Sequence, residues 1–311
     1  MTEQAAERRI AFINPFGTSA FDEIIRETLV PYASRGTTVD VIHLEGVPAN
    51  IDYYYPKHLM ELAIFEEVRR LEVAGYDAVV VGCCYDPGVR VARELVDIPV
   101  VGPLEAAMNH ASYVGHRFTI VTDHRKALPW LEDLVRLHGA ANCRGVRAID
   151  WYVTDMIRDT TSVADDAAAA CIKALSEDTS EVVILGCTII GGCLEREIMT
   201  TGRHRELPIL NPNLLALKAA ESLADLHRMG KYQISRIGFY QRHEQHDAAE
   251  AAEVRRRWRL VDAGASGDAG AGEGPGANGS SLAAEAADRA EPVSAAGERS
   301  AVDAAAGDHS P

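Results

Sequence analysis

The segment Asp77-Ala-Val-Val-Val-Gly-Cys83 has a near copy later in the chain, Glu181-Val-Val-Ile-Leu-Gly-Cys187. In both segments a short aliphatic run, rich in β-branched residues, leads into Gly-Cys. Such a run is typical of a buried strand in a parallel sheet. Open α/β sheets carry their functional groups at the carboxyl ends of such strands. Each segment therefore places one thiol where chemistry is expected.

Strand and helix patterns alternate around these two segments. In the first half, the sequence predicts strands at 9–14, 38–43, 78–82 and 98–102, and helices at 20–32, 62–71 and 87–95. In the second half, it predicts strands at 117–122, 145–152, 182–186 and 207–211, and helices at 125–138 and 163–176. The order in the second half repeats that of the first. Strands joined by helices predict parallel sheets with right-handed crossovers.

The expected fold class is therefore α/β, with two similar Rossmann-like (flavodoxin-like) domains related by a pseudo-twofold axis. The first domain is expected to comprise residues 1–107 and 208–261, and the second residues 108–207. Residues 262–311 are mostly small or acidic, with too few large apolar side chains to offset chain entropy, and are expected to form a disordered tail. Under the pseudo-twofold symmetry, Cys83 and Cys187 are expected to face each other across the cleft between the domains, which is the expected active site.

Composition excludes several classes of protein. The net charge of −15 argues against nucleic-acid binding, although nine acidic residues against two arginines after position 261 account for much of it. No stretch approaches the roughly 18 apolar residues of a membrane span, and the amino-terminal residues lack a signal-peptide pattern. We expect a cytoplasmic protein whose six cysteines stay reduced.

Cofactor and metal motifs are missing from the sequence. No Gly-x-Gly-x-x-Gly or Walker A pattern follows a strand, and no lysine stands in a context typical of a Schiff base. The segment His243-Glu-Gln-His246 spaces its histidines three apart, whereas zinc proteases space them four apart. We therefore expect no cofactor and no metal.

Two opposed thiols suit proton transfer at carbon. A racemase removes a proton from one face and returns one to the other, and cysteines can exchange the two roles. Asp86 is expected to cap a helix that begins at Pro87, whose positive end would stabilise a Cys83 thiolate. After Cys187, the glycines are expected to let backbone N–H donors approach a thiolate or a ligand, and Thr188 is expected to add a hydroxyl. The alternative is that both cysteines are structural, since cysteine is often buried, and that the protein only binds a ligand.

Four segments resemble the aspartate/glutamate racemase superfamily, most closely its hydantoin and allantoin racemases. They are Ile13-Asn14-Pro15, Cys83-Cys84-Tyr85-Asp86-Pro87-Gly88, Ile98-Pro-Val-Val-Gly102 with Glu105-Ala-Ala, and Leu185-Gly-Cys-Thr188. The resemblance implies a cofactor-independent racemase with Cys83 and Cys187 as the acid–base pair. The most favoured substrate is a 5-substituted hydantoin or a related amino-acid derivative, and the chain is a possible homo-oligomer. Alternatives on this fold are an amino-acid racemase, a maleate isomerase and an arylmalonate decarboxylase.

The candidate substrate-binding residues are Asn14, Thr18, Ser19, Cys84, Tyr85, Thr122 and Thr188. Asp123, His110 and His124 are candidates to tune the site, and Tyr53-Tyr54-Tyr55-Pro56 is a candidate cover for the ligand or a subunit interface, with plain packing as the alternative. The stretch Asn14-Pro-Phe-Gly-Thr18-Ser19 departs from the usual Asn-Pro-Asn-Thr-Ser, and Ile189-Ile190 replaces smaller residues or Met. Both departures leave the substrate open.

Overall fold

The computed structural model describes residues 7–49, 52–258 and 260, all of which fall within one compact unit. The segment 262–311, predicted to be a disordered tail, lies outside the described residues. Over the described chain, no helix is both long and apolar enough to cross a bilayer.

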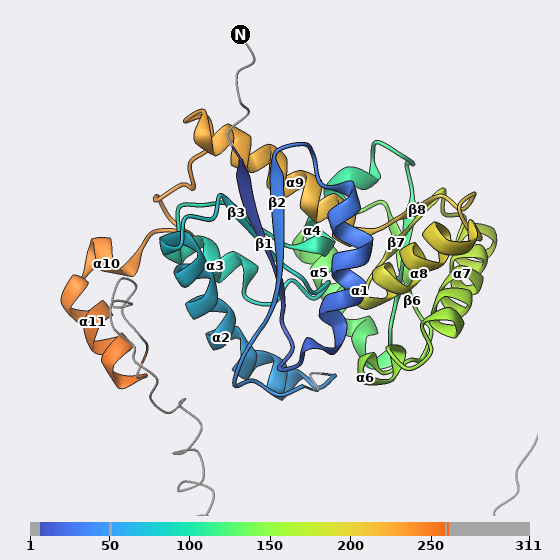
Figure 1. Ribbon diagram of the computed structural model, residues 1–311, viewed down its shortest axis with the longest axis horizontal. Helices are drawn as coiled ribbons and strands as arrows, with labels where there is room; N and C mark the ends of the chain where they lie inside the picture. The colour runs from blue at the N-terminus through green and yellow to red at the C-terminus, as the bar shows by residue number, and fades with distance from the viewer. Residues whose placement is uncertain (1–6, 50–51, 259, 261–311) are drawn as a thin grey trace, which may run out of the picture. The chain divides into compact units, whose positions relative to one another are not determined.

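The first half of the chain forms a four-stranded parallel sheet (Figure 1). Its strands, in spatial order, are β2 (Thr37–His43), β1 (Arg8–Asn14), β3 (Ala78–Val81) and β4 (Val100–Val101). Its helices are α1 (Asp22–Leu29), α2 (Tyr54–Val73), α3 (Val89–Leu95) and α4 (Pro103–Ala111). Strand β3 is buried along its whole length, as its aliphatic run predicts.

The second half forms another parallel sheet with the same order. Its strands are β6 (Cys143–Ala148), β5 (Phe118–Thr122), β7 (Val182–Leu185) and β8 (Ile209–Leu210). Its helices are α5 (Leu128–Leu137), α6 (Val153–Met156), α7 (Thr160–Glu177) and α8 (Thr188–Thr201). The chain continues into α9 (Pro212–Arg228), α10 (His243–His246) and α11 (Ala248–Arg257). The predicted α/β class with two similar parallel sheets is thus confirmed.

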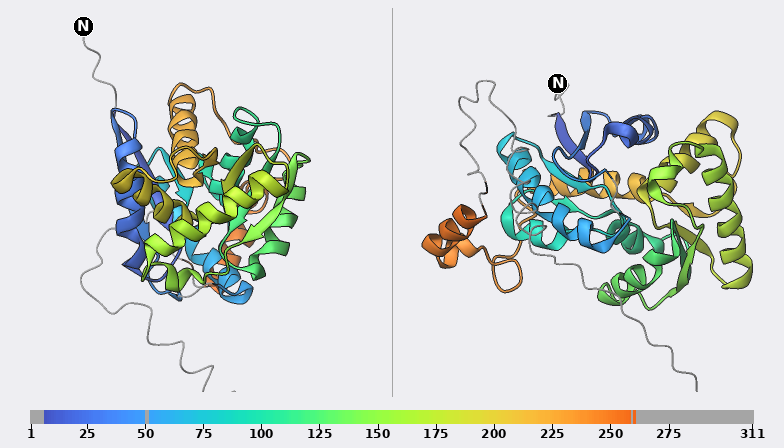
Figure 2. Two further views of the ribbon diagram at one scale, coloured as in Figure 1. Left: turned by 90° about the vertical axis from the view of Figure 1, so that its right-hand side faces the viewer. Right: turned by 90° about the horizontal axis from the view of Figure 1, so that it is seen from below.

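The position of β8 corrects one predicted boundary. Ile209 and Leu210 pair with β7, so these residues complete the second sheet, although the sequence assigns 208–261 to the first domain. Helix α9, which follows directly, packs against β1, β3 and β4 of the first sheet. The right-hand view of Figure 2 separates the first-sheet elements, blue to cyan, from the second-sheet elements, green to yellow. The chain therefore returns to the first lobe after β8.

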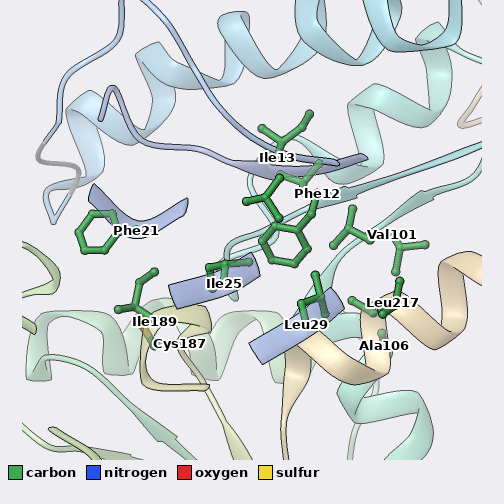
Figure 3. Close-up of a cluster of buried hydrophobic side chains, with 14 of the residues drawn as sticks. Phe12, Ile13, Phe21, Ile25, Leu29, Val101, Ala106, Cys187, Ile189 and Leu217 are labelled. Atoms are coloured by element: carbon green, nitrogen blue, oxygen red, sulfur yellow. The ribbon is translucent and has the colours of Figure 1, made fainter. Parts of the chain in front are cut away.

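Helix α1 joins the two lobes through a shared apolar core. It packs on α8, and Figure 3 shows its Ile25 and Leu29 beside Phe12 of β1, with Ile189 of α8 and Leu217 of α9 nearby. All five side chains are buried. One continuous core therefore holds the lobes together.

The buried face of α2 differs from the predicted one. The apolar spacing of three over Leu62, Phe65, Val68 and Leu71 predicts that these side chains form that face, but Leu62 is 39% exposed. The buried positions are Lys57, Met60, Ile64, Val68 and Leu71. These follow the spacing of three and four that a helix needs to bury one stripe. A lysine is therefore the first member of the buried stripe.

The glycine before each cysteine leaves no room for a side chain. A Cβ at Gly82 would lie 2.1 Å from Cε1 of Phe12 and 2.7 Å from the carbonyl oxygen of Ile13. A Cβ at Gly186 would lie 2.6 Å from Cγ2 of Ile120. Strand β1 therefore passes close to Gly82, and strand β5 passes close to Gly186.

We predict that Gly82→Ala destabilises the protein, because the added methyl group overlaps both a buried ring and backbone. Overpacking of this kind costs about 1–3 kcal/mol, and a lowered midpoint in urea or thermal unfolding would show it. Gly139→Ala is not a usable control because its backbone is left-handed, at φ +65°. Ser176→Ala, on the exposed part of α7, is a better control. Equal stability of Gly82→Ala and wild type would contradict the prediction.

Candidate active site

Cys83 and Cys187 line the same cavity of about 300 Å³, open solvent at its mouth included. Cys83 follows β3 and Cys187 follows β7, and each side chain is less than a tenth exposed. The lining residues are Phe16, Asp52, Lys57, Cys83, Cys84, Tyr85, Asp123, Val153, Gly186, Cys187 and Thr188. Nearly all follow the carboxyl end of a strand. The cavity thus occupies the place where parallel sheets put their chemistry.

Two reciprocal hydrogen bonds join the Gly-Cys segments. The Thr188 hydroxyl, directly after Cys187, donates to the carbonyl of Gly82 at 3.1 Å. The Cys84 thiol, directly after Cys83, donates to the carbonyl of Leu185 at 3.7 Å. Each strand end thus binds the backbone of the other. These contacts hold the two thiols at one cavity.

The helix that follows Cys83 corrects the expected capping. Helix α3 begins at Val89 with Gly88 as its N-cap, so neither Asp86 nor Pro87 starts it. The carboxylate of Asp86 instead accepts the N–H groups of Leu104, at 3.1 Å, and Glu105, at 2.8 Å. It therefore caps α4, a helix that lies further along the chain.

Gly102 makes this distant cap possible. A Cβ at Gly102 would lie 2.5 Å from Cγ of Asp86, so only glycine admits the carboxylate at the start of α4. Asp86 itself adopts a left-handed backbone, at φ 46°. Aspartate and asparagine tolerate that conformation better than most residues.

Helix-terminus donors serve Cys187 rather than Cys83. Cys187 is the N-cap of α8, a helix of 14 residues. Burial raises the pKa of Cys187 well above its usual range and the charge of Asp123 adds to the rise, while the N–H groups of Ile190 and Ile189 lower it. Donors at a helix start stabilise a thiolate. For Cys187, the effect of burial on the pKa is larger than the effect of these N–H donors.

The thiol of Cys83 has different neighbours. Burial raises the pKa of Cys83 to about 11, and the charge of Lys57 is the largest influence that lowers it, followed by the N–H of Tyr85. Asp123 and Asp86 raise that pKa further. The two thiols therefore occupy unequal electrostatic environments.

A cation and a carboxylate flank the aromatic ring of Tyr85. Nζ of Lys57 lies 3.2 Å from the ring centroid, and the phenol donates to Oδ1 of Asp123 over 3.5 Å. Burial raises the pKa of Asp123, whereas the N–H of His124 and the charge of Lys57 lower it. The Thr122 hydroxyl oxygen lies 3.1 Å from Oδ1 of Asp123 and shares its one proton between this carboxylate and the carbonyl of Gly186.

Of the candidate substrate-binding residues, Cys84, Tyr85 and Thr188 lie in the cavity lining. Asn14 and Thr122 are fully buried and lie outside the lining. Asn14 donates to Asp22 at 3.0 Å, and Thr122 donates to the carbonyl of Gly186 at 3.0 Å. Both residues therefore support the strand ends that carry the site.

Thr18 and Ser19 lie outside the lining, in a short 3₁₀ turn. The Thr18 hydroxyl accepts the N–H of Ala20 at 3.2 Å, and Ser19 is exposed. Of the tuning candidates, Asp123 lines the cavity. His124 stacks on Tyr152 with ring centroids 4.3 Å apart, and His110 contacts the carbonyl of Ala106 at 2.7 Å. Neither histidine is part of the lining.

Sequence reasoning missed Lys57, Asp52, Phe16 and Val153. A signal existed for Lys57, which stands in phase with Met60, Ile64 and Val68 on the buried stripe of α2. The other three occupy loops or a short helix, where periodicity gives no information. Within the described residues, no group of three His, Cys, Asp or Glu side chains could hold a metal ion.

The sequence matches a family model described as Asp/Glu/Hydantoin racemase over residues 10–220. The chain belongs to that family. A hydantoin racemase of Pseudomonas sp. (strain NS671) is 31% identical over 222 residues, which cover 70% of this chain and 86% of that protein. The family resemblance inferred from the sequence is thus confirmed, and the chain is an isomerase of the racemase type.

Solved structures agree with this assignment. The allantoin racemase from Klebsiella pneumoniae superimposes with a TM-score of 0.68 and 29% identity, covering 76% of this chain and 94% of that chain. The allantoin racemase from Pseudomonas fluorescens gives a TM-score of 0.65 and 28% identity, covering 75% and 96%. The racemase thus shares the two-sheet fold of these enzymes.

We predict that Asp86→Ala destabilises the racemase more than Asp86→Asn. Alanine loses both the cap of α4 and the tolerance of a left-handed backbone, and loss of a cap alone costs about 1 kcal/mol. Asparagine retains an acceptor oxygen and that tolerance. Thermal unfolding of both variants checks the order, and the reverse order would contradict the capping role.

Proposed function

We propose that this racemase interconverts the enantiomers of a 5-substituted hydantoin or a related amino-acid derivative, with Cys83 and Cys187 as its two acid–base groups. The observation that carries the proposal is the position of both thiols, from different sheets, in the lining of one cavity. The names of the relatives that cover most of the chain favour the ring substrate.

The reaction requires one thiolate and one thiol at the same time. The thiolate takes the proton at C5 of the ring, the C–H electron pair moves toward the neighbouring carbonyl as an enolate, and the opposite thiol returns a proton to the other face. Such positioned proton transfers contribute about 10²-fold to 10⁴-fold each. No metal or cofactor is needed for the balance of protons and charge.

The proposal has a small-molecule substrate as its only required partner. A cytoplasmic location and a homo-oligomeric state remain predictions from the sequence. The arylmalonate decarboxylase alternative requires a single thiol, so the presence of Cys83 and Cys187, from different sheets, in one cavity favours racemisation over it.

We predict that Cys83→Ala and Cys187→Ala each lower the racemisation rate by about 10²-fold or more, because each removes one of the two proton-transfer groups. The measurement is optical rotation of a 5-substituted hydantoin, combined with deuterium uptake at C5 in heavy water.

The matched control is Cys143→Ala, which removes a half-buried thiol of β6 outside the cavity lining. It should racemise like the wild type. Normal turnover in either cavity variant would exclude the two-thiol mechanism. Carbon dioxide release from malonates that survives loss of Cys83 but not of Cys187 would favour the decarboxylase.

We predict that kcat/KM rises with pH from neutral into the alkaline range. Burial raises the pKa of Cys83 to about 11, so at neutral pH this thiol is mostly protonated and the base form increases as pH rises. An N3-methylated hydantoin, which cannot ionise at that nitrogen, separates enzyme titration from substrate titration. A flat or falling profile with that substrate would contradict the prediction.

A further inference from the structure

Lys57 is the only cationic side chain among the described residues that line the cavity of Cys83 and Cys187. It is 8% exposed, and its ammonium group lies over the Tyr85 ring at 3.2 Å from the centroid. Ring faces attract cations but do not neutralise their charge. A buried ammonium group therefore needs a nearby anion.

The start of α2 is bound to the second lobe, which fixes the backbone that carries Lys57. Asp52 accepts the N–H of Val153 at 3.3 Å. The Tyr54 hydroxyl donates to the carbonyl of Lys126, and its ring stacks on Trp130 with centroids 5.5 Å apart. The Tyr54 ring therefore packs between the lobes, whereas Tyr53 and Tyr55 are more than half exposed.

Lys57 lies in the same cavity lining as Cys83, and its ammonium group lies over the ring of Tyr85, two residues after that cysteine. Burial lowers the pKa of Lys57, and Cys83 is the largest influence that raises it, ahead of Asp123, Asp52 and Cys187. Conversely, Lys57 is the largest influence that lowers the pKa of Cys83. The principal charge next to Cys187 is instead that of Asp123, which disfavours a thiolate.

We propose that Lys57 favours the thiolate form of Cys83, so that Cys83 loses its proton before Cys187 and is the first of the two thiols to act as the base. The roles of base and acid rest on the proposed racemase function. The interaction of the Lys57 ammonium group with the Cys83 thiolate, called the charge pair below, does not depend on that function. Lys57 acts on the reaction through Cys83 and is thus a positioning residue.

The consequence for catalysis is an asymmetry between the two directions. The enzyme form in which Cys83 has lost its proton accepts the enantiomer whose C–H bond faces Cys83. The Cys83 thiolate takes that proton and becomes a thiol, while Cys187 gives its own proton to the opposite face and becomes a thiolate. A proton must then pass from Cys83 to Cys187 through solvent before the next turnover in the same direction.

The test is site-resolved alkylation of the ligand-free protein by iodoacetamide, from neutral to alkaline pH. Tandem mass spectrometry distinguishes Cys83 from Cys84 by cleavage between them, and Cys187 lies on another peptide. In the wild type, Cys83 should react with a lower pH midpoint than Cys187. In Lys57→Met the midpoint of Cys83 should rise by about one pH unit or more, the effect of losing an adjacent opposite charge.

Two further variants complete the design. Lys57→Arg keeps the positive charge and should retain most of the wild-type alkylation profile of Cys83. Lys173→Met removes an exposed lysine of α7 and should leave the profile unchanged. Circular dichroism and thermal unfolding establish that each variant is folded. Rescue by arginine distinguishes a charge effect from a packing effect.

An unchanged Cys83 midpoint in folded Lys57→Met would overturn the charge pair, as would a wild type in which Cys187 reacts at lower pH than Cys83. The second outcome needs no variant. A rise in KM for Lys57→Met with an unchanged alkylation profile would also overturn it, because Lys57 would then act only on substrate. If hydantoins are not racemised but the alkylation order holds, the proposed function fails and the charge pair stands.

Discussion

Two buried hydrogen bonds hold the reactive ends of the two sheets together. The residue after each cysteine, Cys84 or Thr188, donates to a backbone carbonyl of the opposite strand end. A hydrogen bond contributes on the order of 1 kcal/mol, but a buried carbonyl left without a partner costs more. The separation of the two thiols is therefore fixed by backbone, and the cavity between them cannot widen without breaking both contacts.

The same region shows why the repeated segments contain glycine. The strand behind each cysteine runs so close that Gly82 and Gly186 have no space for a side chain. Asp86 adds a further constraint, because its carboxylate bridges the residues after Cys83 to the start of α4, where Gly102 admits it. The loop that carries Cys83 is thus held at three points: by β3, by the hydrogen bond of Cys84 to the second lobe, and by the contact of Asp86 with α4.

Local signals explain how much could be predicted. The aliphatic runs before Cys83 and Cys187 identify buried strands without knowledge of anything distant, and the repeated order of strands and helices follows from them. The cap at α4 could not be predicted, because Asp86 and Leu104 are separated by a strand whose path the sequence does not specify. The repeated order places the strand at 207–211 in the second half, and only the domain boundary before residue 208 is wrong, since β8 pairs with β7. Lys57 is predictable from the sequence, because it stands at helical spacing from Met60, Ile64 and Val68. A lysine at such a position is expected to be buried with them.

The placement of Lys57 also bears on how the two lobes share the site. Lys57 and Cys83 both belong to the first lobe, on α2 and after β3, whereas Cys187 belongs to the second. The start of α2 is bound to the second lobe, through Asp52 to Val153 and through Tyr54 to Lys126. The lobe that supplies the second thiol therefore also fixes the position of the cation on the side of the first.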